Sequence, residues 1–91
     1  SETSTAYYVR FDVTGRPGVV AEIAKALADH RIGISGIHSP VDAANPDAEF
    51  VDMVFLLHTC PFGKLQTALS EIEQLDCINS TPVVFRIETL G

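Results

Sequence analysis

Thr14-Gly15-Arg16-Pro17-Gly18-Val19 is the stretch that decides how this chain folds. Before it, apolar and polar residues alternate over residues 7–13, which is the period of a β-strand with one buried face. After it, apolar side chains recur about every four residues over 19–27, which is the period of an amphipathic helix. The hexapeptide is therefore predicted to be a turn between a strand and a helix that runs over about 17–30.

The residues of this turn suit that place. Gly15 tolerates a positive φ without a Cβ penalty. Pro17 fits the first helical position, because its φ is already helical and an N–H there would have no partner. Gly18 leaves the first turn without a side chain, so backbone amides at the positive end of the helix lie open to a carboxylate. The same residues also fit a tight turn that binds nothing.

Strand and helix patterns continue along the chain. A second strand begins at Ile32, and a bulge near Ser35-Gly36 would absorb the residue that puts Ile37 out of phase with Ile34. The other expected elements are a hairpin loop over 40–49, a strand over 50–58, a helix capped by Thr59 or Cys60 with Pro61 in its first turn, and a strand over 83–88. The stripe of this second helix consists of Leu65, Ala68, Leu69, Ile72 and Leu75.

The order β-α-β-β-α-β predicts an α+β, ferredoxin-like fold. Two helices with one apolar stripe each would cover one face of a four-stranded antiparallel sheet, with the first and third strands in the centre. We expect residues 1–6 to be a tail or linker and residues 7–91 to form one domain.

The third strand is apolar on both faces. One face consists of Val51, Met53, Phe55 and Leu57, and the other of Phe50, Val54 and Leu56, with only Asp52 and His58 polar. The second face would lie on the side of the sheet without helices, and the second strand would leave an exposed edge. Because unpaired edges and apolar patches invite partners, we predict a homodimer through the sheet edges, with stacking of the sheet faces as the alternative.

Composition excludes several classes of function. With 12 acidic residues against 6 basic ones, the net charge is −6, which argues against nucleic acid as a partner. No apolar run reaches the length of a membrane span. Cys60 and Cys77 lie on either side of a predicted helix, too far apart to pair, and two free thiols indicate the cytoplasm.

No pattern for catalysis or metal binding stands out. His58 and Cys60 form a single pair of potential ligands, whereas a structural zinc site needs four. Glycine-rich nucleotide motifs and the nucleophile elbow are absent from the sequence. Arg16 lies where small acylphosphatases hold phosphate, but Pro17-Gly18 follows it in place of that family's loop. We therefore expect no catalytic residue, no metal and no cofactor in this chain.

The chain resembles an ACT domain, the small ligand-binding module of many enzymes of amino-acid metabolism. Residues 15–19 are similar to the family's D-R-P-G-V/L turn, and residues 27–34 are similar to its L-x-x-x-G-I-N-I passage. Residues 7–13, Tyr-Tyr-Val-Arg-Phe-Asp-Val, resemble the Y-Y-L-R-x-x-V that opens the C-terminal ACT domain of bacterial homoserine dehydrogenases, and residues 69–75 and 82–88 match its last helix and strand in style.

This resemblance implies a role in regulation. The parent enzyme would reduce aspartate semialdehyde to homoserine with NAD(P)H, and threonine would inhibit it. The carboxylate of an amino-acid ligand would meet the turn at Gly15, Arg16, Gly18 and Val19. Its ammonium group and side chain would lie near Ile34 and His38, across a dimer interface.

Two departures from the family pattern leave a second possibility open. Gly15 stands where the family has Asp, and Gly33 stands where it often has Asn. Both side chains often help to hold a ligand. The alternative prediction is an ACT-type structural module that dimerises without binding a ligand, from this or another enzyme of amino-acid metabolism.

Overall fold

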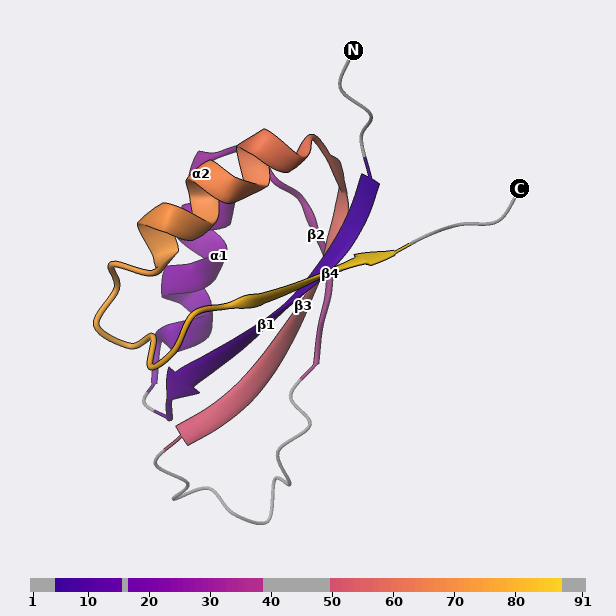
Figure 1. Ribbon diagram of the computed structural model, residues 1–91. Coiled ribbons are helices and arrows are strands. Elements are labelled where there is room, and N and C mark those ends of the chain that lie inside the picture. The colour runs from indigo at the N-terminus through magenta and orange to yellow at the C-terminus, as the bar shows by residue number, and fades with distance from the viewer. Residues whose placement is uncertain (1–4, 16, 39–49, 88–91) are drawn as a thin grey trace.

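The computed structural model describes residues 5–15, 17–38 and 50–87, and of Phe50 the backbone only. The elements are β1 (Thr5–Thr14), α1 (Val19–Asp29), β2 (Ile34–His38), β3 (Phe50–Cys60), α2 (Phe62–Ile72) and β4 (Val83–Ile87). All strand pairs are antiparallel, and the sheet order is β2-β3-β1-β4. Both helices cover the same face of the sheet (Figure 1). The predicted ferredoxin-like fold, with the first and third strands central, is confirmed.

Parts of the sequence-based prediction fall on undescribed residues. The expected hairpin loop over 40–49 and residues 1–4 of the expected tail lie outside the described ranges. Residues 5 and 6 of that tail begin β1, where Thr5 pairs with Cys60 and Ala6 pairs with Ile87.

The core lies between the helices and the inner face of the sheet. In β1 the residues of the expected buried face are at most 2% exposed, and they alternate with more exposed neighbours. Phe11 meets Phe55 of β3 edge to face, with ring centroids 5.4 Å apart. The helices contribute Ile23, Leu27, Leu65, Ala68 and Ile72, all fully buried. Apolar periodicity therefore identified the buried faces of β1 and of both helices. In β4 the alternating Val83 and Phe85 lie on the outer face instead, and Val84 packs against the core.

Both helices begin later than predicted. Helix α1 starts at Val19, and its N-cap is Gly18 with φ of 88°. The left-handed residue that the structure records in this turn is thus Gly18, not Gly15, for which the sequence had also allowed a positive φ. Helix α2 starts at Phe62, and its N-cap is Pro61 with an extended ψ of 141°. The predicted caps at Thr59 or Cys60 are wrong, because pairing with Thr5 keeps β3 extended through Cys60.

The predicted bulge in β2 is confirmed. Ile34 is opposite Leu57, Gly36 is opposite Leu56 and Ile37 is opposite Phe55, so Ser35 is the additional residue. The Ser35 hydroxyl donates to the carbonyl of Leu56 at 3.2 Å. The bulge turns Ile37 to the same side of the sheet as Ile34, as the phase of the apolar residues required.

The outer face of the sheet carries an apolar patch among its charged residues. Tyr8 of β1 stacks on Phe85 of β4, with ring centroids 4.7 Å apart and 16° between the planes. Leu56 pairs with Tyr8 across β1 and β3, and Val54 is two residues away on the same face. Leu56 and Phe85 are 38% and 39% exposed. On the second face of β3, Val54 and Leu56 are therefore apolar as expected, and Asp52 lies beside them. None of the helices in the described residues is long and apolar enough to cross a membrane.

Candidate functional site

The turn between β1 and α1 leaves helix amides open. The carbonyl of Gly18 accepts the amide of Glu22 at 3.0 Å, which is the first hydrogen bond of α1. The amides of Val19, Val20 and Ala21 have no carbonyl partner within the helix, because no helical turn precedes them. The N-cap residue, Gly18, has no side chain that could accept a hydrogen bond from them. A Cβ placed on Gly18 would have nothing within 4 Å. An anion could therefore approach the positive end of α1 closely.

The other predicted site residues lie in different surroundings. Gly15 is exposed, Val19 buries its side chain in the core at 3% exposure, and Arg16 lies outside the described residues. Ile34 packs partly against the core, and His38 is exposed at the end of β2. Val19 can thus contribute only its backbone to a ligand.

The sheet order determines which of these residues can meet. β3 lies between β1 and β2, so β1 and β2 run in the same direction. His38 is consequently at the end of β2 nearer to the β1–α1 turn, opposite Val54 and level with Arg10, while Ile34 is at the far end of β2. The sheet therefore does not bring Ile34 and the turn together within one chain.

The segment after α2 is attached to the end of β1 beside this turn. Val13 and Ile78 form an isolated β-bridge. Thr14 donates its amide to the carbonyl of Cys77 at 2.8 Å, and Asn79 donates its amide to the carbonyl of Asp12 at 2.9 Å. These hydrogen bonds fix residues 76–79 next to the start of α1.

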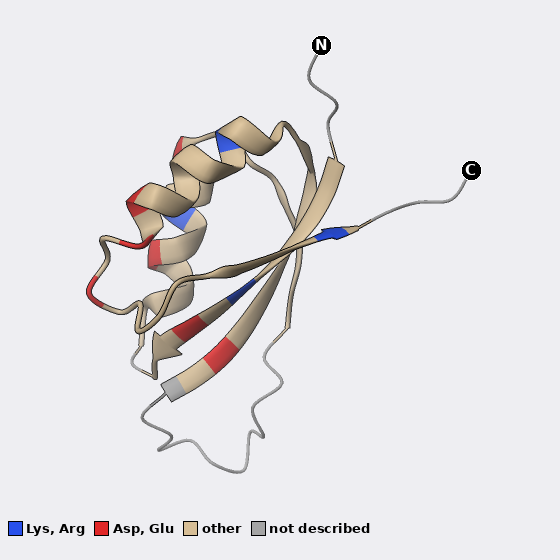
Figure 2. Ribbon diagram, viewed as in Figure 1, with Lys and Arg blue, Asp and Glu red and all other residues tan. Residues whose placement is uncertain are grey.

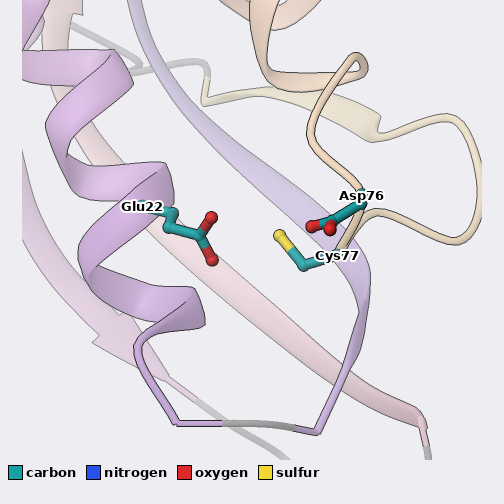
Figure 3. Close-up of side chains that lie close together, drawn as sticks. All are labelled: Glu22, Asp76 and Cys77. Atoms are coloured by element: carbon teal, nitrogen blue, oxygen red, sulfur yellow. The ribbon is translucent and has the colours of Figure 1, made fainter.

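This attachment creates an acidic group that the sequence analysis missed. Glu22 on α1 points toward Asp76 and Cys77 (Figure 3). The atoms that could bind a metal ion, one carboxylate oxygen each from Glu22 and Asp76 and the Sγ of Cys77, lie within 4.8 Å of one another. One Glu22 oxygen, Oε2, is shielded from solvent. Three donors are one fewer than the four ligands of a structural zinc site. Two carboxylates at this position make the electrostatic potential near the start of α1 more negative, which opposes a ligand carboxylate.

The cysteines serve as core residues. Both Cys60 and Cys77 are free thiols and are buried, at 4% and 0% exposure, which confirms that they do not pair. Burial raises the pKa of the Cys60 thiol above its usual value, while the nearby Lys64 ammonium acts in the opposite direction. Cys60 is therefore protonated at neutral pH and is a poor nucleophile.

Comparisons with known proteins give consistent results. A sequence model of the ACT domain family matches residues 7–77. Homoserine dehydrogenase of Neisseria gonorrhoeae is 27% identical over 89 residues, covering 98% of this chain and 20% of that protein. Homoserine dehydrogenase of Methylobacillus glycogenes is 29% identical over 90 residues, covering 99% of this chain and 21% of that protein.

A solved structure agrees with these sequence matches. The crystal structure of a homoserine dehydrogenase from Thiobacillus denitrificans superimposes with a TM-score of 0.84 and 33% sequence identity, covering 99% of this chain and 19% of that one. The chain thus spans about a fifth of the length of the relatives that it matches.

Proposed function

The chain belongs to the ACT domain family, and from this premise we propose that it is the regulatory, amino-acid-sensing and dimerisation domain of a homoserine dehydrogenase. Support comes from two relatives that are homoserine dehydrogenases and match nearly the whole of this chain with one fifth of their own length. The remaining four fifths of such a parent would contain the catalytic domain, which would be the direct partner of this one.

The parent would be an NAD(P)-dependent oxidoreductase of the cytoplasm. It would form homoserine in the aspartate family of amino acids, on the route to threonine and methionine. We propose threonine as the effector, because an ACT domain on this enzyme would then mediate feedback inhibition by an end product of the pathway. Binding here would change the activity of the catalytic domain.

The open start of α1 is the observation that carries this proposal. The ligand carboxylate would accept hydrogen bonds from the amides of Val19 and Val20, next to Gly18. Its ammonium group and side chain would lie toward residues 34–38 of β2 across a dimer interface. Arg16 would add a charge-assisted bond to the carboxylate.

Specific observations also favour the second candidate, a dimerisation module that binds no ligand. Gly15 and Gly33 lack the polar side chains that the family often uses. Glu22 and Asp76 add negative charge near the proposed carboxylate seat. Each of these features weakens the attraction for an amino acid at the turn.

Calorimetric titration of the chain with threonine, and then with other amino acids, separates the two candidates. We expect threonine binding, detected as heat released or absorbed, with the unsubstituted chain and with Gly18→Asn, since Asn tolerates the left-handed conformation. Gly18→Val should lose the binding at the turn, because a β-branched residue at φ of 88° strains the turn.

Circular dichroism of each variant provides the folding control for this titration. If no amino acid binds to a folded, dimeric chain, the ligand-free module is correct. If folded Gly18→Val binds threonine as before, the ligand is not held at this turn.

A further inference from the structure

A hollow on the outer face of the sheet brings opposite charges together. Its volume is about 260 Å³, and the residues that line it are Arg10, Asp12, Asp52, Ser80, Thr81 and Val83. It lies on the face without helices, because Arg10 and Asp12 alternate along β1 with the fully buried Phe11. This volume is below the range of drug-sized pockets and suits a ligand of few heavy atoms.

Two carboxylates face each other in this hollow. Asp12 of β1 and Asp52 of β3 are direct cross-strand partners, an arrangement in which like charges repel. The Arg10 Nη2 atom lies 2.9 Å from the Asp52 Oδ2 atom. Figure 2 shows the basic and acidic positions of β1 and β3 close together near the end of the sheet. The repulsion between the two cross-strand carboxylates favours a cation between them.

The hollow also offers donors for an anion. Arg10 uses one of its five N–H donors for Asp52, and its side chain is 53% exposed. The Ser80 hydroxyl donates to Asp12 Oδ2 at 3.4 Å, which is a long hydrogen bond. Among the described residues, the ion pairs join Arg10 to Asp52, Lys25 to Asp29 and His30 to Glu71, so Asp12 has no basic partner there.

We propose that this hollow binds the zwitterionic head of a small free α-amino acid. The ammonium group lies between the carboxylates of Asp12 and Asp52, and the carboxylate meets the free donors of Arg10. A short side chain meets the hydroxyls of Ser80 and Thr81 and the apolar wall of Val83. The site is on the opposite face of the sheet from α1, so it does not depend on a ligand at Gly18.

The test is an NMR titration of the whole isotope-labelled chain with three probes. L-Threonine has both charges, N-acetyl-L-threonine lacks the ammonium group, and isopropanolamine lacks the carboxylate. We expect saturable shifts of the amides of Arg10, Asp12, Ser80 and Thr81 with L-threonine, and binding at least about tenfold weaker for each of the other two.

Matched variants assign the two charges. Asp12→Asn and Arg10→Gln should each weaken L-threonine binding about tenfold or more at these amides, whereas Asp29→Asn on the exposed side of α1 should change it less than about twofold. A spectrum that keeps the parent dispersion verifies the fold of each variant.

Several results would overturn this assignment. They are equal affinity for all three probes, unchanged affinity in both folded variants, or no shift at all. Shifts confined to Val19 and Val20 would also reject the outer-face site, and they would support the proposed function at the turn. Shifts confined to the outer face would support the outer-face site and contradict binding at the turn. Failure of this proposal can therefore be distinguished from failure of the proposed function.

Discussion

Two residues with left-handed backbone conformation bracket α1. Gly18 precedes the helix with φ of 88°, and Arg31 follows it with φ of 59°. The Arg31 amide donates to the carbonyl of Ala28 at 2.8 Å, and the Ile32 amide donates to the carbonyl of Leu27 at 2.9 Å. These two bonds, with buried Leu27 and Ile32 in register, make a Schellman motif. Its left-handed position usually holds glycine, and here it holds arginine.

Replacing this arginine should stabilise the domain. Left-handed conformation costs a residue with a Cβ about 1–2 kcal/mol, and glycine avoids most of that cost while losing some entropy on folding. We therefore expect Arg31→Gly to raise the free energy of unfolding by about 0.5–1 kcal/mol, measured by urea denaturation. Arg31→Val is the matched control and should lower it. A decrease in the Arg31→Gly variant would contradict this account of the helix end.

At the scale of elements, the segment before β2 and the end of β3 fit closely at Gly33. The His58 amide donates to the carbonyl of Gly33 at 2.9 Å, and the imidazole ring lies over the glycine. A Cβ at Gly33 would be 2.8 Å from His58 Cδ2, closer than such contacts normally are. The family's asparagine therefore cannot simply be restored at this position, because the histidine ring occupies the space of its side chain.

This contact predicts that His58 and Gly33 are energetically coupled. Gly33→Ala should lower the free energy of unfolding by about 1 kcal/mol, since the ring must move, and most of this loss should disappear in the His58→Ala background. Gly36→Ala is the matched control, because its Cβ would meet Leu56 at an ordinary 3.9 Å. Urea denaturation of the double-mutant cycle measures the coupling. Additive losses in the double variant would show that the ring does not restrict Gly33.

Local pattern was enough to predict the elements and the buried faces of β1 and both helices, but not the buried face of β4 or the contacts between distant segments. The bulge at Ser35 followed from the phase of Ile34 and Ile37 alone. The start of α2 was misplaced because Thr5, far away in the sequence, holds Cys60 in the extended strand. The group of Glu22, Asp76 and Cys77 depends on the pairing of residues 77–79 with β1, which no local period indicates.

At the scale of the whole molecule, the two faces of the sheet offer different surfaces. The inner face is closed by both helices (Figure 1). The outer face exposes the stacked Tyr8 and Phe85 beside Leu56. β2 and β4 are the edges of the sheet. On β2, Ile37 is 44% exposed at the edge itself. The apolar outer patch and the β2 edge are therefore separate places at which a second copy could bind.

We predict that the chain is a homodimer in which two β2 strands pair and extend the sheet. An edge strand with unpaired backbone groups and an exposed isoleucine lacks the charges with which edges usually avoid pairing, and a two-fold axis satisfies both copies equally. Ile37→Lys supplies such a charge and should convert the dimer to a monomer at micromolar concentration, as measured by light scattering. Leu56→Lys places the same charge on the outer face and should leave the dimer intact. A monomeric parent chain would refute the prediction, and a dimer that is lost in Leu56→Lys but kept in Ile37→Lys would assign the interface to stacked sheet faces instead.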